Sequence, residues 1–212
     1  MNWMKKVAVA LVCLLPLGLQ AAKVDTLQVK SPSMNKSIEV VVVSPDMAAT
    51  EACPVIYLLH GYGGNARTWV GIKPDLPKIA DEKGIFFVCP DGKNTWYWDS
   101  PLNADVRYET FISDELVKYV DSHYKTVADR KGRAITGLSM GGHGAMWNGL
   151  RHSDVFSAAG STSGGVDIRP FPKNWEMSVQ IGEKAKYPEN WEKYTVINLV
   201  PTLRKDQDRK ST

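Results

Sequence analysis

The chain has 212 residues, of which 43% are hydrophobic, and this content suits one globular domain and excludes a disordered or fibrous protein. The formal net charge is +3, and most of the positive excess lies near the two ends of the chain. The residues between the ends are close to neutral, so the composition predicts no basic face and no nucleic-acid partner.

The first residues are typical of a secretory signal peptide. Two lysines precede the apolar run 7–19, which is too short to span a bilayer, and the small residues Ala21 and Ala22 follow. We expect residues 1–21 to be cleaved and the protein to be periplasmic or secreted, with no membrane contact after cleavage. A retained single-helix anchor is the weaker alternative.

Two cysteines remain after this leader, Cys53 and Cys89. Export makes a disulfide conceivable, but the two residues lie at opposite ends of predicted neighbouring strands. That places them roughly 15 Å apart at about 3.3 Å per residue, whereas a disulfide tolerates at most about 7 Å between Cα atoms. We therefore predict two buried thiols.

The domain opens with two segments that predict an antiparallel pair of strands. Residues 24–29 alternate apolar and polar, residues 38–43 are rich in β-branched side chains, and a Ser-Pro pair follows each. Residues 54–59 then form a continuous apolar run, as expected of a strand covered on both faces. This run stops at the glycine-rich turn 60–64.

Helix and strand patterns alternate through most of the remaining chain. Helices are predicted at 75–83, at 106–123 and from the turn after 138 to about 151, and strands at 85–89, 133–138 and 156–161. A long aromatic loop is predicted at 93–104, a loop or cap at 164–190, and a last helix within 191–203.

This alternation predicts an α/β fold with a mainly parallel sheet and helices on both faces. Ligands of such sheets bind beyond the carboxyl ends of the strands. Gly61, Asp91, Ser139 and Ser161 all fall at predicted strand ends of this kind.

The segment around Ser139 has the pattern of a nucleophile elbow, Gly137-Leu138-Ser139-Met140-Gly141. A strand turns sharply into a helix in such an elbow, and the strained serine at its apex needs neighbours that are almost free of side chain. The helix that follows directs free N–H groups and partial positive charge at the serine oxygen. The alternative is a glycine-rich strand–helix turn with a capping serine.

A second glycine-rich turn, His60-Gly61-Tyr62-Gly63-Gly64, follows a buried strand directly. Its glycines let backbone N–H groups approach a ligand, and one of them can pair with the N–H of the residue after the nucleophile. Two such donors would stabilise a tetrahedral oxyanion. A plain glycine-rich turn is the alternative, and the elbow makes it the lesser one.

These two motifs, with Pro90-Asp91-Gly92 and the loop from Trp96 to Pro101, resemble the esterase D-like family of α/β-hydrolases over about residues 37–200. That family includes feruloyl, acetyl and tributyrin esterases, S-formylglutathione hydrolases and mycolyltransferases. The resemblance implies an α/β-hydrolase domain at 23–212 with one wall of the substrate cleft in the aromatic loop, although ordinary packing of these aromatics is an equal alternative.

The resemblance also implies a role for each matching residue. Ser139 would be the nucleophile, and the amides of Tyr62 and Met140 would form the oxyanion hole. Substrate contacts would come from the glycine-rich turn, at His60 and Gly61, and from the aromatic loop, at Trp96, Tyr97 and Asp99. Nothing in these motifs predicts a metal or a cofactor.

The sequence departs from the family at the catalytic base. In this fold an acid and then a histidine follow the nucleophile, but only His143 and His152 come after Ser139. His143 lies one turn into the elbow helix, and His152 would lie roughly 15–20 Å away at its far end. His60 and His123 precede the serine and fit no better. We therefore predict a chain that is truncated at its C-terminus and lacks the acid and histidine of the triad.

Three functions remain open at this stage. An exported serine esterase acting on acetyl- or feruloyl-type esters, as small molecules or linked to polysaccharide, is favoured. An acyltransferase with the same chemistry and a non-catalytic relic that binds an ester or glycan are the alternatives. The sequence does not predict an oligomeric state.

Overall fold

The computed structural model describes residues 22–202, and its core is a six-stranded sheet in the order β1-β2-β4-β3-β5-β6. The strands are β1 (Lys23–Ser31), β2 (Lys36–Ser44), β3 (Val55–Leu59), β4 (Phe86–Pro90), β5 (Arg133–Gly137) and β6 (Ala158–Ala159). The pairs β1–β2 and β2–β4 are antiparallel, and the other pairs are parallel. The predicted leader and the end of the chain after Thr202 lie outside the described residues.

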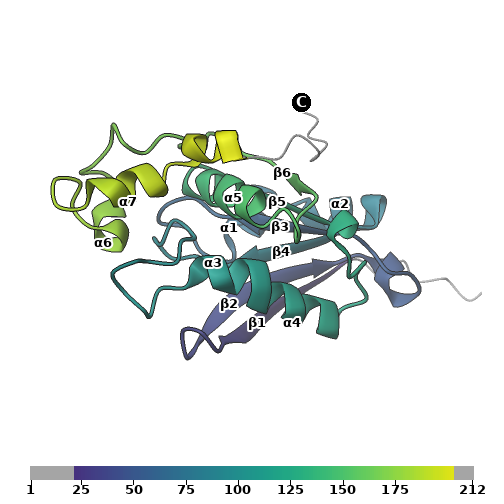
Figure 1. Cartoon of the computed structure of the whole chain (residues 1–212). Helices are drawn as coiled ribbons and strands as arrows, with labels where there is room; N and C mark the ends of the chain where they lie inside the picture. The colour runs from purple at the N-terminus through teal and green to yellow at the C-terminus, as the bar shows by residue number, and fades with distance from the viewer. Residues whose placement is uncertain (1–21, 203–212) are drawn as a thin grey trace, which may run out of the picture.

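Helices cover both faces of this sheet, as the alternating pattern predicted (Figure 1). They are α1 (Thr68–Ile72), α2 (Leu76–Lys83), α3 (Tyr108–Thr110), α4 (Leu116–His123), α5 (Met140–Arg151), α6 (Met177–Ile181) and α7 (Pro188–Lys193). A π-helical turn at Phe111–Glu115 joins α3 to α4, and 3-10 turns lie at Asp46–Ala49, Arg130–Gly132 and Val196–Thr202.

The alternation of side chains along the strands divides the core into two layers. Val55, Tyr57 and Leu59 of β3 pack with residues of α4 and α5, whereas Leu58 packs on the other face with residues of α2. Because β3 is covered on both faces, its sequence is apolar throughout. In this sheet β5 lies between β3 and β6, and α5, which follows the elbow, packs against these three strands.

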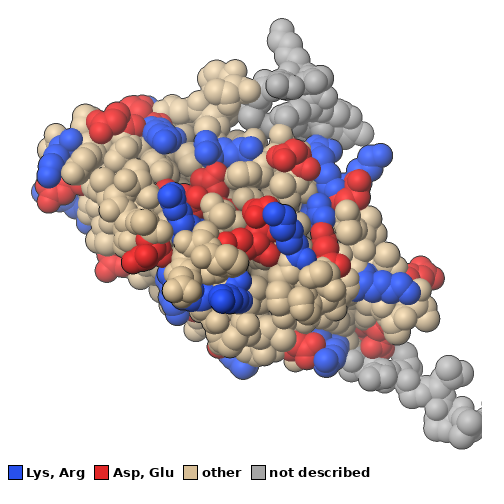
Figure 2. Space-filling view, turned by 60° about the horizontal axis from the view of Figure 1, so that its bottom comes forward, with Lys and Arg blue, Asp and Glu red and all other residues tan. Residues whose placement is uncertain are grey.

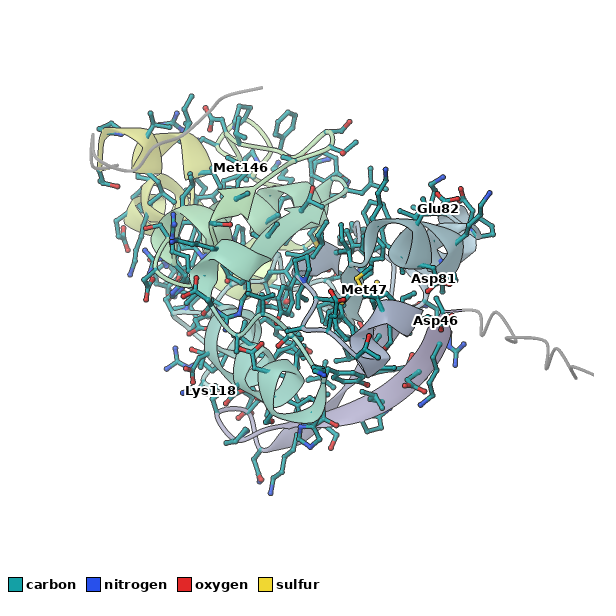
Figure 3. All side chains as sticks on the ribbon, turned by 90° about the vertical axis from the view of Figure 1, so that its right-hand side faces the viewer. Asp46, Met47, Asp81, Glu82, Lys118 and Met146 are labelled. Carbon is teal, nitrogen blue, oxygen red and sulfur yellow. The ribbon has the colours of Figure 1, made fainter. Side chains whose placement is uncertain are left out.

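Two contacts fix α2 against the start of the domain. Asp81 of α2 accepts hydrogen bonds from the backbone N–H groups of Asp46 (2.9 Å) and Ala22 (2.8 Å), and Figure 3 shows Asp46, Met47 and Asp81 together at this junction. The helix ends at Gly84, which has a left-handed φ of 61°, as its sequence predicted.

The segment 164–190, predicted as a loop or cap, is not a loop throughout, because it contains α6 and the first residues of α7. The last helix predicted at 191–203 is divided between α7 and a 3-10 turn at Val196–Thr202. Helices of five or six residues show too little periodicity to be recognised in a sequence, and tertiary packing stabilises them instead.

The prediction of two buried thiols is confirmed, since Cys53 and Cys89 are both free and buried. Burial raises the pKa of Cys89 to about 12, which keeps its thiol protonated at neutral pH.

The face of the molecule in Figure 2 carries acidic and basic side chains that are interspersed rather than segregated. Between residues 22 and 202, the helices are all too short or too polar to cross a bilayer.

Candidate active site

Ser139 occupies the turn between β5 and α5 with φ 54° and ψ −116°, so the predicted strand–turn–helix with a strained serine is present. The glycines on either side are required by packing. A Cβ on Gly137 would lie 2.3 Å from the carbonyl oxygen of Gly141, and one on Gly141 would lie 2.2 Å from that of Leu59. No side chain fits at either position, which explains the spacing of the motif.

Backbone hydrogen bonds hold the serine in this conformation. The Ser139 N–H donates to the Thr162 carbonyl oxygen (2.8 Å), and the Ser139 carbonyl oxygen accepts from the His143 N–H (3.0 Å). The first N–H groups of the twelve-residue helix α5 therefore lie beside the serine, where their partial positive charge favours a developing anion.

Ser139 lines a cavity of about 220 Å³. Its lining combines the glycine-rich turn, the elbow and the aromatic loop with the segment that follows β6, and consists of Tyr62, Trp96, Ser139, Met140, Ser163, Gly165, Asp167, Ile168, Phe171, Trp175 and Met177. Trp96, Met140, Ile168 and Met177 are buried, whereas Tyr62, Phe171 and Trp175 are exposed. The cavity thus has a buried apolar part and an aromatic rim.

Strained backbone is concentrated around this cavity. Apart from Asn35, every described non-glycine residue with positive φ lies in the elbow, the aromatic loop or the segment after β6: Lys93, Trp96, Tyr97, Ser139, Ser163, Trp175 and Glu176. Each such residue costs on the order of 1–3 kcal/mol, and strain of this kind clusters at functional sites. Its location supports a functional role for the cavity.

The buried side chains of His60 and Tyr97 hold the glycine-rich turn in place through hydrogen bonds. His60 accepts a hydrogen bond from the Gly92 N–H at Nε2 (2.9 Å) and donates from Nδ1 to the Gly61 carbonyl oxygen (2.7 Å). The Tyr97 hydroxyl donates to the His60 carbonyl oxygen (3.1 Å). This network places Gly61 next to the nucleophile, because a Cβ on Gly61 would lie 3.6 Å from that of Ser139.

The structure brings together only some of the predicted site residues. Tyr62, Trp96, Ser139 and Met140 line one cavity, and Gly61 adjoins them. His60 and Tyr97 are buried beneath the turn, and Asp99 accepts hydrogen bonds from the Thr110 N–H (3.0 Å) and hydroxyl (2.6 Å). Substrate contacts by these last three residues stay a prediction, and their observed contacts are with the protein itself.

His143 is fully buried, and both of its ring nitrogens have partners. Its Nδ1 donates to the Gly165 carbonyl oxygen (2.7 Å), and its Nε2 accepts from the Trp98 indole N–H (3.0 Å). Burial lowers the pKa of His143 to about 4, although the bond to Gly165 opposes this shift. The ring therefore connects the elbow helix to the aromatic loop and to the segment after β6.

The other histidines are also engaged away from the serine. His152 pairs with Glu109 (2.8 Å), and His123 bonds to the Tyr119 carbonyl oxygen at the end of α4 (2.8 Å). Within residues 22–202, no histidine nitrogen makes a hydrogen bond with Ser139 Oγ. The same part of the chain contains no cluster of three or more side chains that could hold a metal ion.

Sequence reasoning did not find the second half of the cavity wall. Asp167, Ile168, Phe171, Trp175 and Met177 come from the segment 164–190 that was predicted as a loop or cap, and Ser163 directly precedes it. The concentration of aromatic and apolar residues at 168–177 was the available signal, but no spacing pattern ties it to Ser139.

Comparisons with known proteins identify the family to which this architecture belongs. An esterase of Mycobacterium tuberculosis is 30% identical over 149 residues, which cover 67% of this chain and 32% of that protein. An acetyl esterase of Caldicellulosiruptor saccharolyticus is 31% identical over 108 residues, covering 50% of this chain and 40% of that protein. The chain thus spans less than half the length of these curated relatives.

Among solved structures, a ferulic acid esterase superimposes with a TM-score of 0.68 and 28% identity, covering 89% of this chain and 74% of that one. The fold of the described residues is accordingly that of the α/β-hydrolases. The family described as "Putative esterase" matches residues 31–212. Elbow, glycine-rich turn, sheet order and family match agree, and the chain belongs to this esterase family.

Proposed function

We propose that this protein is a serine carboxylic-ester hydrolase that forms an acyl-enzyme on Ser139. The observation that carries the proposal is the strained Ser139 at the N-terminus of α5, opening on a cavity next to a rigidly held glycine-rich turn. Family membership supports the reaction class. The leader-like first residues of the sequence support an exported enzyme.

In the proposed reaction, Ser139 Oγ attacks the carbonyl carbon of the ester and the carbonyl oxygen becomes an oxyanion. The N–H groups of Tyr62 and Met140 donate to that oxyanion, and each such donor contributes roughly 3–4 kcal/mol to the transition state. Collapse of the tetrahedral intermediate releases the alcohol, and water then hydrolyses the acyl-enzyme. Because we assign no histidine as the base, the serine proton passes to solvent water in the first step, and the leaving alcohol takes a proton from water in the second.

The size and lining of the cavity favour a small acyl group. Its volume of about 220 Å³ lies below the range of about 300–1,000 Å³ that is usual for drug-sized ligands. An acetyl group or a single aromatic ring suits the buried wall of Trp96, Ile168 and Met177. The names of two similar proteins, an acetyl esterase and a ferulic acid esterase, agree with such acyl groups.

We further propose that no histidine of this chain serves as the catalytic base, so that the 212-residue chain has impaired turnover. All four histidines of the sequence lie within the described residues, and each hydrogen-bonds elsewhere. An oxyanion hole without the triad retains a rate enhancement of about 10³–10⁴ over water, far below that of a complete triad.

The test is covalent labelling with a fluorophosphonate, followed by a chromogenic short-chain ester assay. We expect slow labelling of the full chain at Ser139, no labelling of Ser139→Ala, and only trace turnover. Ser163→Ala is a matched control, because Ser163 lines the same cavity and also has positive φ. Equal labelling of Ser139→Ala would remove Ser139 from the reaction, and robust turnover lost in His143→Gln or His152→Gln would refute the proposed lack of a base.

No histidine among residues 22–202 hydrogen-bonds to Ser139 Oγ, which also favours a second candidate, a binding protein that retains the cavity without turnover. Trp96 and Trp175 line the cavity and would report a bound ester or glycan by fluorescence. Saturable binding together with no labelling of Ser139 would favour this candidate over the esterase.

A further inference from the structure

Besides the contacts of His60 and Tyr97, the glycine-rich turn has a further contact with Asn94, a residue with no assigned role. The Asn94 side-chain oxygen accepts a hydrogen bond from the Gly63 N–H (2.9 Å). Gly63 follows Tyr62, whose own N–H is the proposed oxyanion donor. The Asn94 contact therefore restrains the peptide next to that donor.

The other end of the Asn94 amide contacts the segment after β6. Its Nδ2 donates to Glu176 Oε2 (3.3 Å). Desolvation and the Glu176 carboxylate also raise the pKa of Tyr62. Glu176 thus contacts Asn94 and interacts with Tyr62, and through Asn94 it joins the turn to the cap residues 163–177.

A second contact connects the aromatic loop, which contains Asn94, to the cap residues 163–177. The Trp96 indole N–H donates to the Trp175 carbonyl oxygen (3.1 Å), and the two rings lie with their centroids 6.4 Å apart. Trp96, Trp175 and Glu176 all have left-handed backbone. Trp96 and Trp175 both line the cavity, so this contact and the strained backbone coincide at the cavity wall, where strain of this kind supports a functional role.

We propose that Asn94 is a positioning residue for the oxyanion hole, and that it couples the turn to the cap through Glu176. This inference rests on the proposed function, because it assigns a role in forming the hole. A substrate that fills the cavity and contacts the cap stabilises the same arrangement that holds the Tyr62 amide in place. Asn94 then affects the transition state more than the binding of the ground state.

The conservative and non-conservative variants separate the two contacts of Asn94. Asn94→Ala removes both of them. Asn94→Asp keeps an acceptor for the Gly63 N–H but loses the donor to Glu176 and places two carboxylates together. Glu176→Gln keeps an acceptor for Asn94, whereas Glu176→Ala does not.

Asn103→Ala is the matched control for a general effect on the loop. The Asn103 side chain accepts a backbone N–H, that of Asp105, at the same distance of 2.9 Å, but it is exposed and this bond stays within its own loop instead of reaching the glycine-rich turn. The measured quantities are the second-order rate of fluorophosphonate labelling at Ser139, kcat and KM for an aryl acetate, and the melting temperature.

We expect Asn94→Ala to lower the labelling rate and kcat at least tenfold with KM changed less than threefold, because a displaced oxyanion donor acts on the transition state. Glu176→Gln should retain most of the rate, Glu176→Ala and Asn94→Asp should each lose several-fold, and Asn103→Ala should stay within twofold. The double variant Asn94→Ala/Glu176→Ala should be no slower than Asn94→Ala alone.

Labelling of Asn94→Ala at the rate of Asn103→Ala would overturn the inference, and so would a rise in KM that accounts for the whole loss. If Asn94→Ala melts at a much lower temperature, a general loss of stability could explain its slow labelling. The labelling rates of Glu176→Gln and Glu176→Ala then test the coupling, and equal rates for these two variants would refute it. These outcomes differ from failure of the proposed function, in which Ser139→Ala would be labelled as fast as the unmodified chain.

Discussion

The buried His143 predicts that the protein loses stability in mild acid. Its pKa is about 4 in the folded chain because burial disfavours the charged ring, against an ordinary value of 6.5. Between these two values the unfolded state binds more protons than the native state, so stability falls as the pH is lowered. The loss relative to neutral pH is about 2 kcal/mol at pH 5 and about 3 kcal/mol at pH 4.

The structural cause is that a protonated ring cannot keep both of its hydrogen bonds. His143 Nε2 accepts from the Trp98 indole, and protonation would place two N–H groups against each other. The rings of Trp96, Trp98 and Trp147 surround this site with centroids 5.2 to 6.5 Å from that of His143. Lowering the pH should therefore loosen the aromatic loop first, and this loop contributes Trp96 to the cavity wall.

The assay is urea unfolding at pH 7, 6 and 5, followed by tryptophan fluorescence, for the unmodified chain and His143→Gln. Glutamine can accept from Trp98 and donate to Gly165 but does not titrate, so the variant should begin less stable and lose about 2 kcal/mol less between pH 7 and pH 5. His123→Gln is the control, because His123 is exposed at the end of α4. A pH profile of His143→Gln parallel to that of the unmodified chain would refute the reasoning.

Two further substitutions, each with a matched control, test the packing of the protein. Gly141→Ala should destabilise the fold by about 3 kcal/mol in a urea titration, because the new Cβ would lie 2.2 and 2.5 Å from the backbone oxygens of Leu59 and His60. Gly71→Ala is its control and should be neutral or stabilising in the same titration, because its Cβ would meet nothing within 4 Å. Glu109→Ala should cost about 3 kcal/mol, because the carboxylate is buried and accepts from Trp147, Arg151 and His152. Asp114→Ala, which breaks an exposed pair with Lys118 in the same helical segment, should change the melting curve by less than about 0.5 kcal/mol, and equal losses in these two variants would contradict the assigned burial.

The sheet and the elbow could be predicted because their causes are local. The apolar run at 54–59 requires cover on both faces, and the glycines around Ser139 are set by clashes with the backbone of β3 and the helix itself. Short-range steric clashes and side-chain periodicity depend on residues that are close in the sequence, so they can be recognised from it. The helix at 106–123 was found for the same reason, although its π-helical turn leaves no mark in the sequence.

The cavity could not be predicted because it depends on contacts between distant segments. Trp175 joins the site through a hydrogen bond from Trp96, and Gly165 joins it through the ring of His143. His143 itself shows the limit of motif reading. Its position near the serine drew attention as a possible base, but its function in the fold depends on a tryptophan from another loop.

The order of the strands has a consequence for synthesis of the chain. β3 lies between β4 and β5, and its pairing with β5 joins Val55 to Arg133, which closes a loop of roughly 80 residues. A ribosome adding about 5–20 residues per second would complete that loop some 4–16 s after β3 emerges. During this interval an apolar strand has an unpaired edge, which is the kind of segment that chaperones bind. Slow emergence of β5 would therefore favour aggregation, and the yield of soluble protein should respond to the rate of translation between these two strands.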